Sequence, residues 1–474
     1  MTTSLPRRRV IVQSLTAAGL MATPGLPLLL AAESLLVSNV TQLYSVRVAR
    51  IVSPHTAADV VKALAAWPGK VAVGGGRYSM GGQVAVAGGL HIDMRGMNKL
   101  VWLRAAQRQV RVQAGMRWRE LQTLIDPHGL AIKTMQSYAN FTVGGAVSVN
   151  AHGRYVGNGP VGHSVRALQL VLADGQMVEA NRQQNASLFR AALGGYGAVG
   201  VITEVELDLV PNDRMERVVK PVRLEDYPAF FRDHVLADGA SLMHNADLMP
   251  PHFDEPVSVT WRRTELPLTE PARLVPQGQS YMLEQNVIWL MTEVPGAERL
   301  RSAVIHPLLD KGRAVVWRNH EASLDVAELE PRTRRISTYV LQEYFVPPRH
   351  FVAFARGMAK VLREHHVEAL NVSVRHSPAD VDALLPWAKE EVFSFVLYYK
   401  QRTPARAQQA VGEWTRALID LVLQHEGRYY LPYQLHATRQ QFDRAYPEAQ
   451  ALREFKQRVD PRGVFSNELW AKYL

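Results

Sequence analysis

Three consecutive glycines, Gly74, Gly75 and Gly76, constrain this chain more than any other feature. They lie in the segment VAVGGGRYSMGGQVAVAGGLHID (71–93), between two apolar runs that are typical of β-strands. Because glycine has no Cβ, a turn of this kind lets backbone N–H groups approach a phosphate group closely. The segment alone leaves two interpretations open: a glycine-rich hairpin turn, or a loop that holds the phosphates of a nucleotide cofactor.

With 474 residues the chain is long enough for two domains. In the first part, helices are predicted over 57–67 and 118–127, and strands are predicted to resume over 141–211. The cluster Pro211-Asn212-Asp213 breaks regular structure and predicts a domain boundary. Beyond it a mixed pattern predicts strands over 257–261, 286–291, 314–319 and 393–399, and helices over 348–366 and 405–426.

The segment from Gly195 to Gly200 (GYGAVG) fits the G-x-G-x-x-G pattern of dinucleotide-binding folds. Such a motif must follow a strand and open a helix. Here a helical pattern (187–193) precedes the glycines and a strand follows them, so the order is reversed. We therefore do not expect a Rossmann site.

The composition excludes several classes of site. The chain has no cysteine, which rules out disulfides, a catalytic thiolate and Cys-ligated zinc, and no metal site is expected. The formal net charge is +10, but basic residues are interspersed with acidic ones, so nucleic-acid binding is not expected. A basic surface attracts anionic lipids, so peripheral membrane contact stays open.

The first 32 residues have the pattern of an export signal. Arg7, Arg8 and Arg9 precede an uncharged run from Val10 to Ala32, which Pro24 and Pro27 interrupt. Adjacent arginines before a modest apolar run resemble a twin-arginine signal, which exports folded proteins to the periplasm. The alternative is an uncleaved N-terminal anchor helix.

Several motifs recur together in one known group of proteins. The segments are FTVGGAVSVNAHGRYVGNGPVGHSV (141–165), YGAVGVITEVELDLVP (196–211) and FKQRVDPRGVFSNELW (455–470). Together with the glycine-rich segment 71–93, which we call the glycine loop, they resemble the vanillyl-alcohol oxidase and p-cresol methylhydroxylase superfamily. The resemblance implies an α+β fold. It comprises a two-part FAD-binding domain of the p-cresol methylhydroxylase type (40–212), an α/β substrate or cap domain with an antiparallel sheet (213–428), and a C-terminal segment (429–474) that returns to the FAD domain.

The resemblance also implies how FAD is held. Many members tether FAD through a histidine in the glycine loop, a position that falls on Arg77 or Tyr78 here. Since neither is histidine, we expect non-covalent FAD. The residues that the resemblance places against the cofactor are Gly74, Gly75, Gly76, Arg77, Tyr78, Ser79, Gln83, Thr142, Gly144, Gly145, Ser148, His152, Gly153, Gly197, Gly200, Val201 and Ile202.

Within this superfamily the chain is similar to sugar-lactone oxidases, alditol oxidases and decaprenylphosphoryl-ribose oxidase. The run VLQEYFVP (340–347) resembles their strand over the flavin, in which Gln342 matches an active-site glutamine. The run LNVS (370–373) resembles a strand that supplies an active-site asparagine, here Asn371. The segment YLPYQ (430–434) matches one that brings a catalytic lysine to the flavin, a position occupied here by Tyr433 or, one step on, Gln434.

Two further candidates, Arg375 and His376, follow the asparagine strand. An arginine near the flavin would stabilise the reduced, anionic ring in place of the missing lysine. The alternative is surface charge at the end of a strand.

The leading functional prediction is an exported FAD-dependent oxidase or dehydrogenase that moves a hydride from a CH–OH group to flavin N5. The substrate would be a sugar, polyol, lactone or related alcohol, and the electron acceptor oxygen, a quinone or a cytochrome. Oxidation of an amine or of a phenolic benzylic centre stays open, because Tyr344, Tyr398, Tyr399 and Tyr433 offer material for an aromatic pocket. A flavin-binding protein without turnover is a third alternative.

Overall fold

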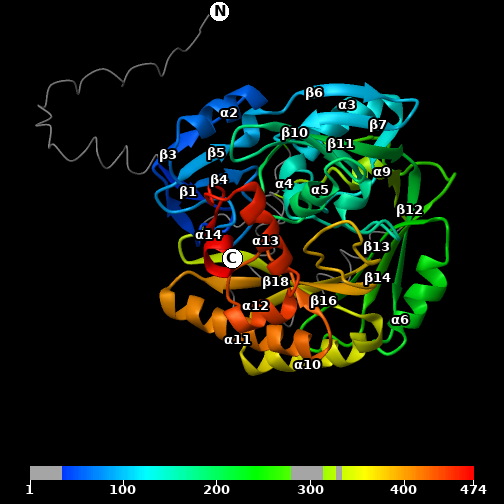
Figure 1. Cartoon of the computed structure of the whole chain (residues 1–474). Coiled ribbons are helices and arrows are strands. Elements are labelled where there is room, and N and C mark those ends of the chain that lie inside the picture. Colours follow the sequence, from blue (N-terminus) through cyan, green and yellow to red (C-terminus); the bar gives the residue numbers. More distant parts are fainter. Residues whose placement is uncertain (1–34, 279–312, 327–333) are drawn as a thin grey trace, which may run out of the picture.

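The computed structural model describes residues 35–278, 313–326 and 334–474, and shows an α+β protein built mainly on antiparallel sheets (Figure 1). The predicted signal (1–32) and the predicted strand 286–291 lie outside the described residues. Within the described part of the chain, no helix is long and apolar enough to cross a membrane.

Two small sheets carry the N-terminal part of the described chain. An antiparallel pair is formed by β1 (Leu36–Ser38) and β2 (Ser45–Arg47), and a parallel sheet has the order β3 (Arg50–Val52), β5 (Leu90–Asp93), β4 (Val71–Gly74). Helix α2 (Ala57–Ala65) connects β3 to β4, as predicted. The Thr56 hydroxyl accepts from the backbone N–H of Asp59, which fixes the start of the helix.

A six-stranded antiparallel sheet follows, with the order β10-β9-β11-β7-β6 and β8 paired to the far end of β11. On β7, Val110 and Val112 are buried while their neighbours are partly exposed, which is the alternation of a sheet with one covered face. The strands are β6 (Leu100–Arg104), β7 (Gln109–Gln113), β8 (Leu130–Ile132), β9 (Val165–Val171), β10 (Met177–Asn181) and β11 (Val201–Pro211), and the helices are α3 (Trp118–Ile125), α4 (Val143–Ser148) and α5 (Ala186–Ala192).

Helix α4 corrects the prediction that strands resume at residue 141. Residues 143–148 form a short helix that packs tightly, because a Cβ on Gly144 would lie 2.6 Å from Ala114 Cβ. The small residues of VGGAVS therefore allow a close helix–backbone approach that a hydrophobicity pattern does not reveal.

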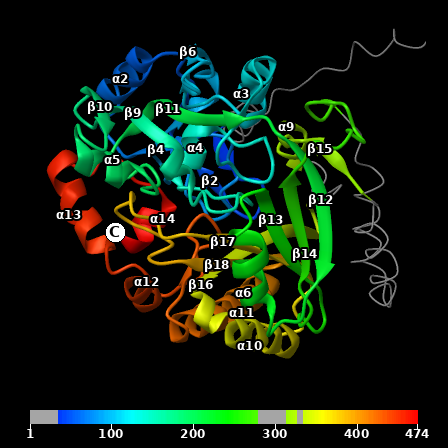
Figure 2. The same ribbon diagram turned by 90° about the vertical axis from the view of Figure 1, so that its right-hand side faces the viewer.

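The chain leaves the six-stranded sheet at Pro211 and enters an eight-stranded antiparallel sheet at Arg214. Helices α10 (Phe351–Glu364) and α11 (Ala405–Gln424), both predicted, cover one face of this sheet (Figure 1). The strands in spatial order are β15 (Val315–Trp317), β12 (Arg214–Pro221), β14 (Val257–Arg263), β13 (Ser241–Leu248), β17 (Ala369–Ser377), β18 (Val392–Arg402), β16 (Ser337–Val346) and β19 (Arg428–Tyr429). Figure 2 shows β12, β13 and β14 side by side with α6 (Tyr227–Phe230) packed beside them.

The predicted strand 314–319 is shorter than expected. Only Val315–Trp317 pair as β15, and Arg318–Glu321 turn into the short helix α9, where Arg318 is buried and donates to the carbonyl of Lys133. The remaining helices of the described residues are the π-helical turn η4 (Phe231–Leu236), α12 (Arg439–Ala445), α13 (Ala449–Val459) and α14 (Glu468–Tyr473). Short 3-10 turns span Met94–Gly96, Asp126–His128, Val161–Ser164 and Pro348–His350.

The C-terminal part contacts the glycine loop directly. Val71 forms a parallel bridge with Phe465, and the Gln83 amide donates to the backbone carbonyls of Leu431 and Tyr433 at 2.8 Å each. The fold thus brings the glycine loop, α4 and one face of the eight-stranded sheet together.

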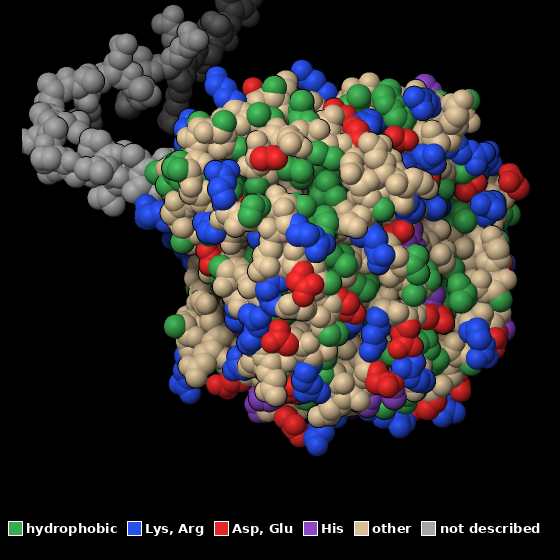
Figure 3. Space-filling model, in the orientation of Figure 1, with side chains coloured by type: hydrophobic (Ala, Val, Ile, Leu, Met, Phe, Trp, Pro, Cys, Tyr) green, Lys and Arg blue, Asp and Glu red, His purple; other side chains and the backbone are tan. Residues whose placement is uncertain are grey.

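Charged side chains of both signs are interspersed on the surface face shown in Figure 3.

Candidate active site

One cavity lies where these three elements meet, with about 1680 Å³ of empty space that opens to solvent. It is lined from the N-terminal part by the glycine loop and α4, and from the eight-stranded sheet by Leu341, Glu343, Arg375 and Val396. The predicted residues that line it are Gly75, Gly76, Arg77, Tyr78, Ser79, Gln83, Thr142, Gly144, Gly145, Ser148, His152, Gly197, Gly200, Ile202, Arg375 and Tyr433. The predicted residues outside the lining are Gly74, Gly153, Val201, Gln342, Asn371 and His376.

The glycine loop and the start of α4 form a cradle in which glycines leave the space beside the Thr142 side chain open. A Cβ on Gly75 would lie 2.1 Å from Thr142 Oγ1, and a Cβ on Gly145 would lie 2.7 Å from the same oxygen. This hydroxyl is buried and has no hydrogen-bond partner among the described residues. An orphan polar atom beside exposed backbone fits the phosphate oxygens of a nucleotide cofactor.

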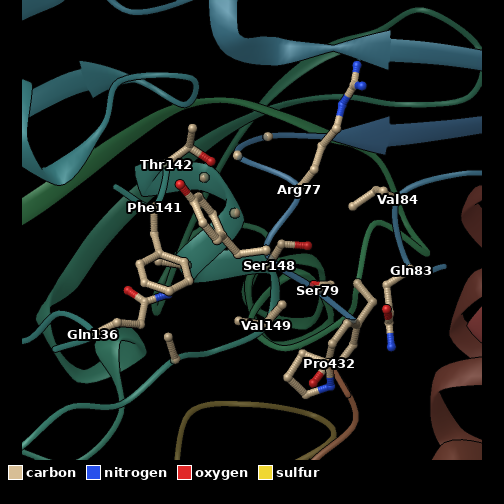
Figure 4. A pocket seen from close by; sticks show the side chains of 18 of the residues that line it. Arg77, Ser79, Gln83, Val84, Gln136, Phe141, Thr142, Ser148, Val149 and Pro432 are labelled. Carbon is tan, nitrogen blue, oxygen red and sulfur yellow. The ribbon is translucent and has the colours of Figure 1, made fainter. Parts of the chain in front are cut away.

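Arg77 contributes its backbone to this cradle, while its side chain points away from the cavity (Figure 4). Its Nη2 donates to Asp93 Oδ2 at 2.9 Å and lies 3.1 Å from His91 Nε2. Because Arg77 has a φ of 61°, the loop turns through the left-handed region at this residue. Arg77, one of the two residues at the predicted tethering position, therefore has its side chain paired within the protein. Tyr78, the other, lines the cavity, and its ring lies 4.6 Å from that of Phe141.

Strand register identifies which side chains of the eight-stranded sheet face the cavity. Glu343 lies opposite Val396, Val396 opposite Ser373, and Ser373 opposite Asp247. Directly opposed residues share a face of a sheet, and Glu343 and Val396 both line the cavity. Asp247, Ser373, Val396 and Glu343 therefore form a row across four strands on the cavity face.

Glu343 is the centre of a buried hydrogen-bonded group. Its Oε1 lies 2.5 Å from His152 Nε2, and its Oε2 accepts from the Tyr433 hydroxyl at 3.0 Å. The His152 ring packs 4.9 Å from Trp387 and 5.7 Å from Phe345, centre to centre, which fixes its orientation. All three members of the group line the cavity.

The electrostatics of this group keep one negative charge in the cavity wall. Burial raises the pKa of Glu343, but His152, Arg375 and the Tyr433 hydrogen bond outweigh burial and hold that pKa below its usual value. Burial and the adjacent Glu343 charge raise the pKa of the Tyr433 phenol well above its usual value. Glu343 is therefore an ionised carboxylate at neutral pH, and Tyr433 keeps its proton.

Gln342 lies on the opposite face of β16, which corrects its predicted place over the flavin. It forms a hydrogen bond with Tyr399, whose ring packs 4.9 Å from Trp414 of α11. Since side chains alternate along a strand, a one-residue shift exchanges the two faces. Glu343, the next residue, projects into the cavity instead.

His376 also lies on the face away from the cavity. Its ring is 4.6 Å from that of Phe231, and its Nε2 lies 2.7 Å from Glu391 Oε1. Burial lowers the pKa of His376, which the Glu391 carboxylate partly offsets. The structure gives this residue a packing role and does not bring it to the site.

Arg375 and Asn371 lie on the cavity face of β17. Arg375 lines the cavity, and its buried Nε has no hydrogen-bond partner among the described residues. Asn371 is outside the lining, and its amide donates to Asp247 Oδ1 at 3.2 Å. Asp247 also accepts from Asn245 at 3.1 Å, so this face of the sheet carries a hydrogen-bonded group of polar side chains.

The tyrosines that could have formed an aromatic pocket do not converge. Tyr344 and Tyr399 are fully buried on the helix-covered face, where the Tyr344 ring lies 5.9 Å from Phe354 of α10. Of the four tyrosines considered, only Tyr433 lines the cavity.

Sequence reasoning missed Glu343 and Asp247. The signal for Glu343 was its position, because a carboxylate inside the apolar run VLQEYFVP must have a partner if the strand is buried. Asp247 gave no comparable signal, since its role depends on strand pairing between distant segments.

Comparison with known proteins agrees with this geometry. Residues 48–181 match the FAD binding domain family, and residues 232–473, half of the chain, match the D-arabinono-1,4-lactone oxidase family. The chain is 25% identical to L-gulonolactone oxidase of Bos taurus over 408 residues, which cover 84% of this chain and 88% of that protein.

Two bacterial relatives match shorter stretches. Alditol oxidase of a Streptomyces species is 40% identical over 104 residues (22% of this chain, 25% of that protein). Decaprenylphosphoryl-beta-D-ribose oxidase of Mycolicibacterium smegmatis is 32% identical over 147 residues (31% of this chain, 32% of that protein). The chain therefore belongs to the D-arabinono-1,4-lactone oxidase family, as an FAD-dependent oxidoreductase that acts on hydroxyl-bearing donors.

Proposed function

We propose that this enzyme oxidises one CH–OH group of a small polyhydroxylated molecule, such as a sugar lactone or an alditol. The observation that carries the proposal is a set of polar side chains on and beside the cavity face of the sheet. Arg375 and Tyr433 line the cavity, and Asp247 and Asn371 lie on the same face of the sheet and are hydrogen-bonded to each other. Together they offer hydrogen-bond acceptors and donors to several hydroxyl groups at once.

Non-covalent FAD in a domain of the p-cresol methylhydroxylase type is part of the proposal. The cradle of Gly75, Gly145 and Thr142 would hold the diphosphate, and bound FAD supplies the acceptor for a hydride. Arg77 favours a non-covalent cofactor because its side chain is engaged with Asp93 and is not a nucleophile. If acid-denatured holoprotein retained its yellow colour after filtration, this part of the proposal would be wrong.

The protein residues would position the substrate and control its proton. Arg375 lines the cavity, and its Nε, which has no hydrogen-bond partner among the described residues, suits a substrate oxygen or the negative charge of a reduced flavin. The Tyr433 hydroxyl donates its proton to Glu343, so its oxygen would accept a hydrogen bond from a substrate hydroxyl placed beside it. The walls formed by Leu341 and Val396 are apolar and exclude water from one side.

The test is anaerobic reduction of the holoenzyme by a matched panel of donors. We expect sugar lactones and alditols to bleach the flavin. The affinity of the enzyme for the donor should rise as hydroxyl groups are added to a carbon chain of constant length. Monohydric alcohols of the same carbon number serve as the control. Bleaching by aromatic amines or phenols but not by any polyol would contradict the proposal.

We also propose that the chain is exported to the periplasm with its flavin bound and that it passes electrons to oxygen, a quinone or a cytochrome. The support for export is the run Arg7-Arg8-Arg9 before an interrupted apolar segment. Replacing Arg7 and Arg8, or Arg8 and Arg9, by lysine should leave flavin-loaded protein in the cytoplasm. Unchanged periplasmic activity in both double variants would refute this.

A further inference from the structure

Glu343 stands apart from every other group in the cavity wall. Among the described residues that line the cavity, Glu343 is the one with a carboxylate, and only 2% of this residue is exposed. An ionised carboxylate in such a place costs free energy unless it is hydrogen-bonded. Both oxygens have partners, His152 on one side and Tyr433 on the other.

The direction of the Tyr433 hydrogen bond decides what this phenol offers to a substrate. Its single proton is donated to Glu343 Oε2, so the remaining capacity of the oxygen is to accept. A substrate hydroxyl beside Tyr433 therefore donates to it. The result is a continuous chain of donors from substrate to Tyr433 to Glu343.

The groups that face Glu343 come from several elements. His152 approaches from the loop after α4, Arg375 from β17, and Tyr430 and Tyr433 from the segment after β19, while Tyr196 and Tyr446 are further phenols that feel its charge. The Tyr430 hydroxyl donates to the Val149 carbonyl at 2.7 Å, so it is directed to the backbone. Of the phenols near Glu343, Tyr433 is the one whose hydroxyl is bonded to the carboxylate.

We propose that Glu343 is the general base of the reaction and that it takes the substrate proton through Tyr433, with His152 as a positioning residue. This rests on the FAD-dependent oxidation of a CH–OH group. The O–H and C–H bonds of the substrate break and the C=O bond forms. The carbon-bound hydrogen leaves with both electrons to FAD, which is reduced. The hydroxyl proton moves to the Tyr433 oxygen as the phenol proton moves to Glu343 Oε2.

Two single variants, their double variant and one control test the relay in the holoenzyme by rapid anaerobic mixing with the most effective polyol of the panel. Glu343→Gln keeps the shape of the side chain and should slow flavin reduction by about 10²- to 10⁴-fold, as expected for loss of a general base. Tyr433→Phe should slow it by roughly 10- to 1000-fold. The double variant should be little slower than the worse single variant, because the two residues act as a unit.

Tyr344→Phe is the matched control. Tyr344 follows Glu343 on the same strand, but its hydroxyl is buried on the other face without a hydrogen-bond partner among the described residues. The rate of flavin reduction in Tyr344→Phe should equal that of the wild type. In the wild type the rate should fall toward acid pH as Glu343 is protonated, and in Glu343→Gln this limb should disappear while the rate rises with hydroxide.

A measurement without substrate separates failure of the relay from failure of the proposed function. Ultraviolet absorbance is measured against pH for the wild type and for Glu343→Gln, each with and without the additional change Tyr433→Phe. The difference within each pair reports the ionisation of the Tyr433 phenol. Replacing Glu343 by Gln removes the adjacent negative charge, so Tyr433 should ionise at a lower pH than in the wild type. An unchanged titration, or a wild-type reduction rate in Glu343→Gln, would overturn the relay. If Glu343→Gln does not retain flavin, a wild-type reduction rate in Tyr433→Phe overturns it and a reduced rate supports it.

Discussion

Replacing Gly75 by Ala tests the cofactor cradle. The new Cβ would lie 2.1 Å from Thr142 Oγ1, about 1.3 Å short of ordinary contact, which begins at 3.4 Å. Thr142 can relieve this overlap by turning its hydroxyl into the cavity, but bound FAD would force it back. Overpacking of this kind costs about 1–3 kcal/mol, so FAD should bind roughly 5- to 150-fold more weakly.

The assay is a fluorescence titration of flavin-free protein with FAD. Gly239→Ala is the matched control, because a Cβ at Gly239 meets nothing within 4 Å and no positive φ is recorded there. Adding Thr142→Ala to Gly75→Ala leaves Cβ as the nearest Thr142 atom, at 3.3 Å, and should restore part of the affinity. Wild-type affinity in Gly75→Ala would refute the assignment of this loop to the cofactor.

Three further outcomes are expected. Burial lowers the pKa of His91 to about 4, of His244 to about 3 and of His436 to about 4. The unfolded chain binds these protons first as the pH falls from about 6.5, so stability should drop toward pH 4 by about 1.4 kcal/mol per pH unit for each proton. Urea unfolding at pH 7 and pH 5 with equal midpoints would contradict this. Gln342→Ala should lower the free energy of unfolding by about 1–3 kcal/mol without changing KM, and a raised KM at normal stability would restore its place over the flavin. Asp247→Asn should raise KM for long polyols more than for short ones and leave kcat nearly unchanged, whereas a large loss of kcat alone would count against a binding role.

The sequence supported a large part of the fold. Apolar periodicity and the capping pattern at Thr56 predicted α2, and similar patterns predicted α3, α10 and α11, because each buries a regular stripe. The resemblance to the flavoenzyme superfamily, the FAD cofactor and oxidation of CH–OH donors are confirmed by the family matches. The alternative of a flavin-binding protein without turnover is thereby set aside.

The site was less accessible to sequence reasoning for a specific physical reason. Successive side chains of a strand point to opposite faces of the sheet. A one-residue shift in the alignment of VLQEYFVP therefore predicted Gln342 at the site, whereas Glu343 is the residue that lines the cavity. The prediction for His376 was wrong for the same reason, since His376 follows Arg375 on β17 and packs against Phe231 of η4. The two parts of the cradle were predictable because each is a short glycine-containing run of the sequence, one at Gly75 and one at Gly145. The polar side chains of the sheet come together only through pairing between β13, β16, β17 and β18.

The central claim is that this cavity oxidises a hydroxyl-bearing carbon with FAD, and the most direct test is the visible spectrum of the purified holoenzyme under anaerobic conditions. We expect the flavin absorbance to disappear on addition of a sugar lactone or alditol, and the product to carry a new carbonyl group in an amount equal to the flavin reduced. A flavin that stays oxidised with every hydroxyl-bearing donor, while an amine bleaches it, would contradict the account.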